Sequence, residues 1–434
     1  MPSGDFVTQH SHSAFSIHLE HSTLNIASLA GGLGPCPGLD ARAVVGLEVA
    51  ERVLDTGKEM FEQGRDRIVP LVMAMRHVEQ ASFPLAADPA QRVIVIGPLS
   101  AFLGLVLGRH LVVAAQGRGH EVTLFNRGNY SSEELGAVES IKGDRHTELH
   151  KLKGRRWDAV VDTSGHLPRA VKAAAEVLAD EVERYVFISS QNAYRDVSIP
   201  GIEETYPLRT LTSEQLERAN AIDTSGQPSY GELYGGLKAL CEQAAEVVMP
   251  NRVLIIRPGL IVGPDDYSDR FTYWPVRVAR GGEVLAPGRP DRFIQFIDVR
   301  DLAEWTISMI ERKTTGAYNT HGLPGSLTMQ QLLDECKSVT GSDAQFTWVS
   351  EDFLLRENVA AWTELPLWLP EEAAPHLNGF MFISPEKAIK AGLNFRPLRD
   401  TISDTLAWHE TKDLKAGLDR DKERALLYKW HAQT

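Results

Sequence analysis

The sequence predicts an α/β fold built on a doubly wound parallel sheet, with a smaller C-terminal region and an N-terminal helical extension. Short β-branched runs, beginning with "RVIVIG" at 92–97, recur along the middle of the chain and alternate with helical segments. The runs are apolar throughout, which is typical of parallel strands that helices cover on both faces. Right-handed crossovers between such strands gather the ligand-binding residues at the carboxyl ends of the strands.

Five strands and three helices follow this alternation. The strands are predicted at 92–97, 120–128, 156–165, 183–190 and 251–259, and the helices at 103–117, 167–180 and 230–248. These elements define a sheet domain at 91–262. Residues 263–410 are expected to fold over its ligand edge, with 293–320 returning to the sheet, and residues 411–434 to form a C-terminal helical tail.

Residues 1–90 are predicted to form the N-terminal extension. Residues 1–40 are polar and indicate a flexible segment, and 41–80 repeat apolar residues at the three- and four-residue spacing of helices. Residues 82–91 contain two prolines and small side chains, which is typical of a linker. The helices could form a homodimer contact or a cap over the ligand crevice. Alternatively, a misplaced start site would explain the presence of this extension.

Composition excludes several classes of protein. The 434 residues are 43% hydrophobic, which suits a globular chain with a substantial core. A formal charge of -13, without a basic run to offset it, disfavours nucleic acid as a partner. Three scattered cysteines predict neither a disulfide framework nor a metal site, and they fit a reducing cytoplasm. No signal peptide and no membrane span of about 20 apolar residues is visible.

The turn after the first strand carries glycines where a dinucleotide needs them. Gly97 takes the place of the first glycine and Gly104 that of the last, while Ala101 stands near the place of the middle one. The outer glycines are separated by seven positions rather than the usual spacing, and Pro98 removes one N–H donor. This altered pattern is compatible with a dinucleotide site and equally with a simple strand–turn–helix.

Polar residues after the next two strands favour a phosphorylated dinucleotide. The second strand ends in Asn126 and Arg127 rather than an acidic residue, and a guanidinium can bind a 2′-phosphate that a carboxylate would repel. The cofactor is therefore expected to be NADP, with NAD as the alternative, although Arg127 would also suit a surface turn. Asp144 could accept a hydrogen bond from the adenine amino group. The small residues Thr163, Ser164 and Gly165 would let the cofactor lie close.

A serine, a tyrosine and a lysine supply the candidate chemistry. Ser189 and Ser190 end a buried strand, so their hydroxyls are expected to point into the ligand crevice. In "YGGLK", Tyr234 and Lys238 are one helical turn apart and share a face. A nearby ammonium favours the phenolate and would lower the tyrosine pKa from about 10. Tyr230 is the rival tyrosine, but the residue four positions on is not a cation.

These pieces together resemble the extended short-chain dehydrogenase/reductase superfamily, and within it the NAD-dependent epimerase/dehydratase family. The resemblance spans residues 92–410 and depends on "RVIVIG…FLG", "DTSG", "FISSQNAY", "YGGLK", "IIRPGLIVGP" and "QFIDVRDLAEW" in the family's order. It implies a Rossmann-like dinucleotide-binding domain at 91–262 and a substrate-binding region at 263–410. Residues 1–90 have no counterpart in the family.

The resemblance also implies roles for individual residues. Tyr234 would be the catalytic acid/base, Lys238 the residue that lowers its pKa, and Ser190 the third member. Asp298 would order the edge of the sheet. Cofactor contacts would come from Gly97, Ala101, Phe102, Leu103, Gly104, Ser189, Pro258 and Gly259. One added residue in the glycine loop and about one added helical turn depart from the family pattern and weaken the expectation of tight cofactor binding.

The substrate is left open by the sequence. Tyr273, Trp274, Arg277 and Arg289 lie where family members bind substrate, and they would suit a nucleotide-sugar diphosphate, a core or a surface equally. Gln191 and Asn192 are expected substrate contacts, and they replace the Asp-Glu pair that sugar 4,6-dehydration needs. The expected function is NAD(P)-dependent hydride transfer to or from a secondary alcohol or ketone in a small molecule. A non-catalytic nucleotide sensor or scaffold is the alternative.

Overall fold

The protein is described by a computed structural model that covers most of the chain. It describes residues 16–19, 22–25, 90–97, 103–128, 135–136, 138–224, 229–409 and 413–433. The chain divides into two compact units, residues 1–89 and residues 90–434. In unit 1, strands β1 (Ser16–Leu19) and β2 (Ser22–Asn25) pair antiparallel, inside the segment that was expected to be flexible. The helices expected at 41–80 lie outside the described residues.

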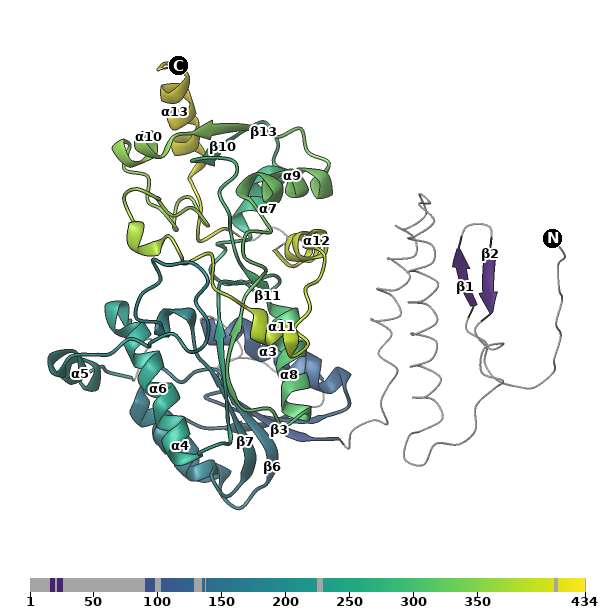
Figure 1. Cartoon of the computed structure of the whole chain (residues 1–434), viewed down its shortest axis with the longest axis vertical. Helices are drawn as coiled ribbons and strands as arrows, with labels where there is room; N and C mark the ends of the chain where they lie inside the picture. The colour runs from purple at the N-terminus through teal and green to yellow at the C-terminus, as the bar shows by residue number, and fades with distance from the viewer. Residues whose placement is uncertain are drawn as a thin grey trace, which may run out of the picture. The chain divides into compact units, whose positions relative to one another are not determined.

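Unit 2 is organised around a seven-stranded sheet in the order β12-β8-β7-β6-β3-β4-β5, in which every neighbouring pair is parallel (Figure 1). The strands are β3 (Arg92–Ile96), β4 (Glu121–Asn126), β5 (Glu139–Lys142), β6 (Trp157–Asp162), β7 (Val182–Ile188), β8 (Val253–Pro258) and β12 (Gly316–Thr320). The predicted doubly wound sheet is confirmed, and the segment expected to return to the sheet supplies its edge strand β12.

Helices cover both faces of this sheet because its strands are apolar on both faces. In β3, Val93 and Val95 join one core cluster with residues of α3 (Leu103–Gly117) and α8 (Val299–Glu311). The intervening Ile94 and Ile96 join a second cluster with residues of α4 (Pro168–Leu178) and α6 (Tyr234–Val248). Alternate residues of one strand therefore point to opposite faces of the sheet and pack into two separate cores. Figure 1 shows α4 and α6 on the same side of the sheet.

The C-terminal region packs around a third core cluster. It combines α7 (Tyr273–Ala279), β10 (Glu283–Pro287), α9 (Met329–Thr340), β13 (Gln345–Val349), α10 (Glu351–Arg356), α12 (Leu398–His409) and α13 (Arg420–His431). Strand β10 pairs with β13, and a short parallel pair joins β9 (Ile261–Val262) to β11 (Ile297–Asp298). Asp298 accepts a hydrogen bond from the backbone N–H of Arg300 and forms an ion pair with its guanidinium, so it caps the start of α8.

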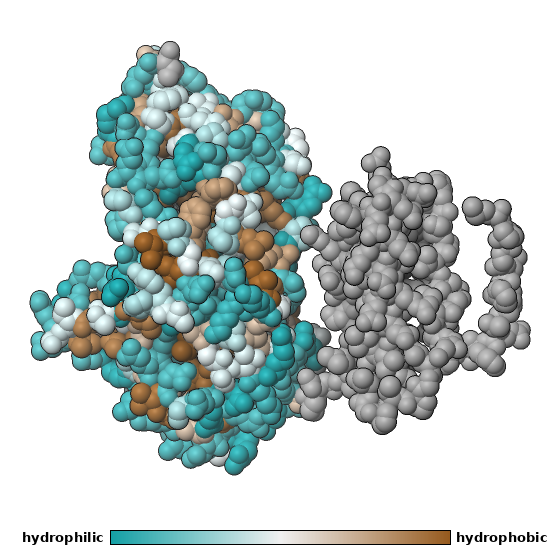
Figure 2. All heavy atoms as spheres, in the orientation of Figure 1, coloured by the Kyte–Doolittle hydropathy of each residue, from teal (hydrophilic) through white to brown (hydrophobic). Residues whose placement is uncertain are grey.

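The surface of unit 2 is mixed in polarity. Figure 2 shows hydrophobic residues interspersed with hydrophilic ones on the visible face. Within the described part of the chain, no helix is long and apolar enough to cross a membrane. No group of three metal-ligating side chains occurs among the described residues.

Candidate active site at the carboxyl edge of the sheet

The expected site residues gather along one edge of the sheet because all of its strands run parallel. The residues at or just after the strand ends are His321 (β12), Gly259 (β8), Ser189 and Ser190 (β7), Thr163 and Ser164 (β6), Gly97 (β3), Arg127 (β4) and Asp144 (β5). In a doubly wound sheet this carboxyl edge is where ligands bind.

The glycines of "YGGLK" allow Ser190 to reach Tyr234. The 3-10 turn η4 (Gln191–Ala193), which follows Ser190, packs directly on α6. A Cβ atom on Gly235 would lie 2.0 Å from the carbonyl oxygen of Asn192, so any other residue would push the turn away. Gly236 is in similarly close contact with Leu211. Close approach of these two backbones therefore brings the Ser190 hydroxyl near enough to act on the Tyr234 phenol, whose pKa it lowers.

Tyr234 has an acidity opposite to the one expected from the sequence. Burial raises the pKa of Tyr234 to about 12, and the hydrogen bond with Ser190 opposes this rise only in part. Tyr267 adds a smaller electrostatic effect that raises the pKa further. The expected lowering of this pKa by Lys238 is not found, because desolvation is the largest effect on the phenol and Lys238 is not among the groups that shift its pKa.

Lys238 is buried and bound to backbone carbonyls rather than to a carboxylate. Its Nζ atom donates to the carbonyl oxygens of Gly165, 2.8 Å away, and Ile188, 2.6 Å away, and it lies 4.4 Å from the centroid of the Phe187 ring. Burial lowers the pKa of Lys238 to about 8. An ammonium has three N–H donors, so two are used by the ends of β6 and β7.

A buried ion pair, which the sequence did not indicate, fixes the turn after β6. The Arg145 guanidinium donates to both carboxylate oxygens of Asp162, at 2.7 and 2.8 Å, and to the Ser164 hydroxyl at 2.8 Å. The Tyr185 hydroxyl donates to the same carboxylate at 2.7 Å. Burial alone would raise the pKa of Asp162, but these contacts lower it below its usual range. Because Gly165 follows directly, the ion pair also holds the carbonyl that binds Lys238.

The glycine loop is described only in part. Gly97 directly follows β3 and has a φ of 150°, and a Cβ atom there would lie 2.2 Å from the Thr163 hydroxyl oxygen, so a glycine is required. Ala101 and Phe102 lie outside the described residues. Leu103 and Gly104 form the first turn of α3. The small residues of the β6 turn therefore lie against the first strand, as well as at the ligand edge.

The polar residues after β4 and β5 have different surroundings. The Asn126 side chain accepts a hydrogen bond from the backbone N–H of Gly128 and so forms the turn itself. Arg127 is exposed and forms no ion pair with any described residue. Asp144 accepts a hydrogen bond from the backbone N–H of His146 and likewise stabilises a turn. Of the three, Arg127 is the side chain left available to a ligand.

Ser189 does not turn toward the crevice as expected. Its hydroxyl donates a short hydrogen bond to Glu242 of α6, and that carboxylate also binds the guanidinium of Arg257 in β8 at 2.7 and 3.0 Å. The expected direction of the Ser189 hydroxyl is therefore wrong: it points into the core, where the buried carboxylate of Glu242 binds hydrogen-bond donors. Gly259, which follows Pro258, lies against the imidazole of His321.

Most of the expected substrate residues occupy other places. Trp274 and Tyr273 are buried in the C-terminal core, and the Trp274 indole donates to the carbonyl oxygen of Pro366 at 2.8 Å. This burial assigns both to the core rather than to substrate. Arg289 is exposed and bound to Glu371. Gln191 is buried next to Ser190, and its Oε1 atom lacks a hydrogen-bond partner among the described residues; Asn192 is half-buried beside it.

Two aromatic residues that the sequence did not single out as a pair flank Tyr234. The rings of His166 and Tyr230 are stacked, with centroids 5.0 Å apart and planes 6° apart. The His166 ring is also 6.2 Å from that of Tyr234. Its Nδ1 atom lies 2.9 Å from the Ser164 carbonyl oxygen and so carries the proton. Burial, followed by the charge of Lys238, lowers the pKa of His166 to about 3, so the ring is neutral.

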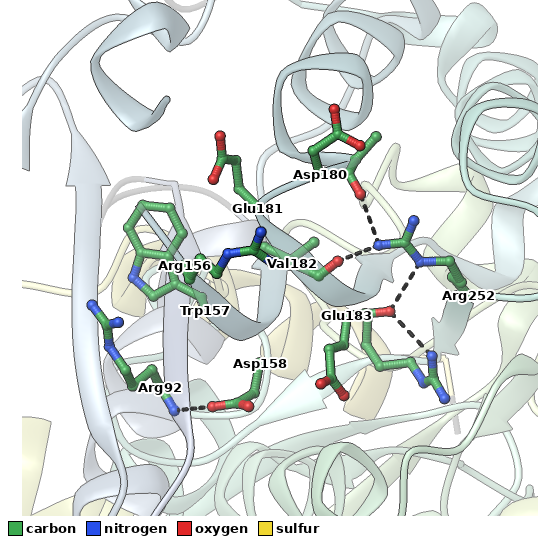
Figure 3. A pocket seen from close by; sticks show the side chains of 11 residues that line it. Arg92, Arg156, Trp157, Asp158, Asp180, Glu181, Val182, Glu183 and Arg252 are labelled. Carbon is green, nitrogen blue, oxygen red and sulfur yellow. Dashed lines mark hydrogen bonds between the residues drawn. The ribbon is translucent and has the colours of Figure 1, made fainter. Parts of the chain in front are cut away.

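A separate pocket of about 740 Å³ lies at the opposite, amino edge of the sheet (Figure 3). Residues at the beginnings of β3, β6 and β7 line it, together with Arg252 before β8. The Arg252 guanidinium donates to the carbonyl oxygens of Val182 and Glu183, as Figure 3 shows, and also to that of Ala179. The pocket therefore holds an arginine that is already bound to backbone, and it is distinct from the Tyr234 site.

The structure of the chain is similar to solved structures of epimerases. A solved UDP-glucose 4-epimerase has a TM-score of 0.52 at 16% identity, covering 76% of this chain and 100% of its own. A candidate epimerase from Burkholderia cenocepacia has a TM-score of 0.51 at 18% identity, covering 74% and 99%. A UDP-glucuronic acid 4-epimerase from Bacillus cereus, solved with NAD, has a TM-score of 0.50 at 14% identity, covering 73% and 98%. These likenesses show the fold.

The family of the chain is shown by a family model and not by any single related protein. No curated protein matches the sequence. The model of the NAD dependent epimerase/dehydratase family matches residues 105–321, which is half of the chain. The match begins after the altered glycine loop and includes Ser190, Tyr234 and Lys238. The chain therefore belongs to the NAD dependent epimerase/dehydratase family.

Proposed function

We propose that the protein is an NAD(P)-dependent oxidoreductase that interconverts a secondary alcohol and a ketone in a small molecule. The observation that carries the proposal is the arrangement at the carboxyl edge of the sheet. The Ser190 hydroxyl lies close enough to the Tyr234 phenol to lower its pKa, and Lys238 lies one helical turn away on the same helix. A proton donor held beside a hydroxyl at a dinucleotide edge is what reversible carbonyl reduction requires.

The residues present fit a nicotinamide dinucleotide. Lys238 uses two N–H groups on the carbonyls of Gly165 and Ile188, which leaves the third for a ribose hydroxyl. When bound, the nicotinamide would supply or accept the hydride at its C4 atom. The exposed Arg127 guanidinium at the end of β4 suits a 2′-phosphate, so we favour NADP over NAD.

The side chains divide the proton chemistry between them. In the reducing direction Tyr234 donates its hydroxyl proton to the carbonyl oxygen as the hydride reaches the carbonyl carbon, and solvent then returns a proton to the phenolate. Ser190 holds the same oxygen. A pKa raised to about 12 keeps Tyr234 protonated at neutral pH, which supports its role as the proton donor in the reducing direction. Lys238 stabilises the phenolate that the transfer leaves behind.

The proposal is tested by titrating the purified full-length chain with NADPH and NADH, followed by fluorescence. We expect both to bind, NADPH more tightly. Arg127→Ala should weaken NADPH binding about tenfold, because it removes a charge-assisted contact, and leave NADH unchanged. Binding of neither nucleotide would overturn the enzyme assignment and support the alternative, a scaffold on the same fold. Equal losses for both nucleotides would refute the role of Arg127 alone.

A further inference from the structure

The space around Tyr234 is bordered by uncharged aromatic and amide side chains. His166, Tyr230 and Tyr234 are all half-buried. The near-parallel stack of His166 on Tyr230 forms a flat wall, here named the aromatic wall, beside the phenol of Tyr234. Flat ring faces of this kind bind flat or ring-shaped apolar surfaces.

The residue after Ser190 also disfavours an anion. Gln191 is 4% exposed, and its Oε1 atom has no donor among the described residues. A buried acceptor without a partner is costly, and a negatively charged acceptor brought against it adds to that cost. A phosphate oxygen is an acceptor and would be repelled there.

The arginines suited to a diphosphate already have carboxylate partners. Arg277 is buried and donates to Glu423 of α13 at 2.7 Å and to the backbone carbonyl of Gly281 at 3.1 Å. Binding a phosphate would leave Glu423 as an uncompensated buried carboxylate.

The remaining two arginines share one acid. The guanidinium groups of Arg289 and Arg292 lie 2.9 and 3.4 Å from the carboxylate of Glu371, and Arg289 also pairs with Asp291 at 2.8 Å. A nucleotide diphosphate would have to displace these acids before it could bind.

We infer that the substrate is an uncharged cyclic ketone or alcohol whose flat ring lies against the aromatic wall of His166 and Tyr230, rather than a nucleotide-diphosphate sugar. This inference rests on the proposed function, since it places the carbonyl oxygen between Tyr234 and Ser190. It restricts the substrate to molecules without a phosphate group.

The test uses the NADPH-saturated full-length chain and two probes, 1-tetralone as the uncharged cyclic ketone and UDP-glucose as the diphosphate sugar. Binding is measured by isothermal titration calorimetry, so it does not depend on turnover. We expect 1-tetralone to bind and UDP-glucose to give no heat. Tyr230→Leu and His166→Leu should each weaken 1-tetralone binding about 3- to 10-fold, the worth of a ring contact. Tyr230→Phe keeps the ring and should bind as the wild type does.

Three results would overturn the inference: UDP-glucose binding that is lost in Arg292→Ala, no binding of 1-tetralone, or equal affinity of the wild type and both leucine variants. NADPH binding by each variant serves as the control for folding, and His166→Phe replaces His166→Leu if the latter fails it. Loss of NADPH binding by the wild type would instead refute the proposed function, so the two failures are distinguishable.

Discussion

The carboxyl and amino edges of the central sheet are built from the same seven strands, yet they treat ionisable side chains differently. At the carboxyl edge, Lys238 and His321 are buried and pair with no carboxylate of the described residues, and burial lowers the pKa of each. At the amino edge, Arg252 binds backbone carbonyls and Arg92 lies in an exposed pair with Glu121. Buried groups with shifted pKa values, as at the carboxyl edge, are typical of a functional site. Arginines that already have hydrogen-bond or ion-pair partners, as at the amino edge, are typical of a protein surface.

The largest expected effect comes from removing the Tyr234 hydroxyl. Tyr234→Phe should lower turnover of a reducible ketone by about 10²- to 10⁴-fold, the usual contribution of a positioned proton donor. NADPH binding should be unchanged, because the ring is kept. Turnover is followed by NADPH absorbance, with the amino-edge variant Arg156→Ala as the control. Wild-type turnover in Tyr234→Phe would mean that another group donates the proton.

The buried Arg145–Asp162 pair at the carboxyl edge should contribute more to stability than an exposed pair at the amino edge. Arg145→Met should lower the free energy of unfolding by about 3–5 kcal/mol, because it leaves the Asp162 carboxylate buried and unpaired. Adding Asp162→Asn should recover part of this loss by removing the charge. Urea denaturation of the single and double variants measures both effects. A loss below about 1 kcal/mol in the single variant would show that the pair is solvated like a surface pair.

The histidine after β12 predicts a dependence of stability on pH. Burial lowers the pKa of His321 to about 3, against about 6.5 in an unfolded chain. The unfolded state therefore binds the extra proton below pH 6.5, and the stability present above that pH is lost as the pH falls toward 3. His321→Gln should remove up to about 1.4 kcal/mol per pH unit of this loss between pH 6 and 4. Parallel urea-denaturation profiles for the two proteins would show that His321 becomes protonated in the native state.

The smallest effect is expected at the amino edge. Arg92 and Glu121 lie 3.6 Å apart, with side chains 49% and 76% exposed, so solvent screens their attraction. Arg92→Ala should change the free energy of unfolding by less than about 1 kcal/mol and leave NADPH binding intact. Differential scanning calorimetry checks the first point and fluorescence titration the second. A larger loss of unfolding free energy would mean that ionisable groups at the amino edge matter to stability as much as those at the carboxyl edge.

The local pattern of apolar residues was sufficient to predict most strands of the sheet and the helices beside them. The predicted helix at 103–117 coincides with α3, and the helix expected from 230 begins as an α-helix at Tyr234, after the 3-10 turn η5 (Gly231–Leu233). Strand β5 was not predicted. It lies at the edge of the sheet with three of its four residues exposed, so it lacks the apolar run by which central strands are recognised.

The sequence by itself determined the parallel sheet, the edge at which its polar residues meet, and the shared helical face of Tyr234 and Lys238, because strand and helix periodicity are local properties. Only the tertiary structure decided which groups those side chains meet. It turned Ser189 toward Glu242, placed Trp274 in the core, paired Arg289 with Glu371, and raised the pKa of Tyr234. Burial and pairing depend on residues far away in the chain, and no local spacing encodes them.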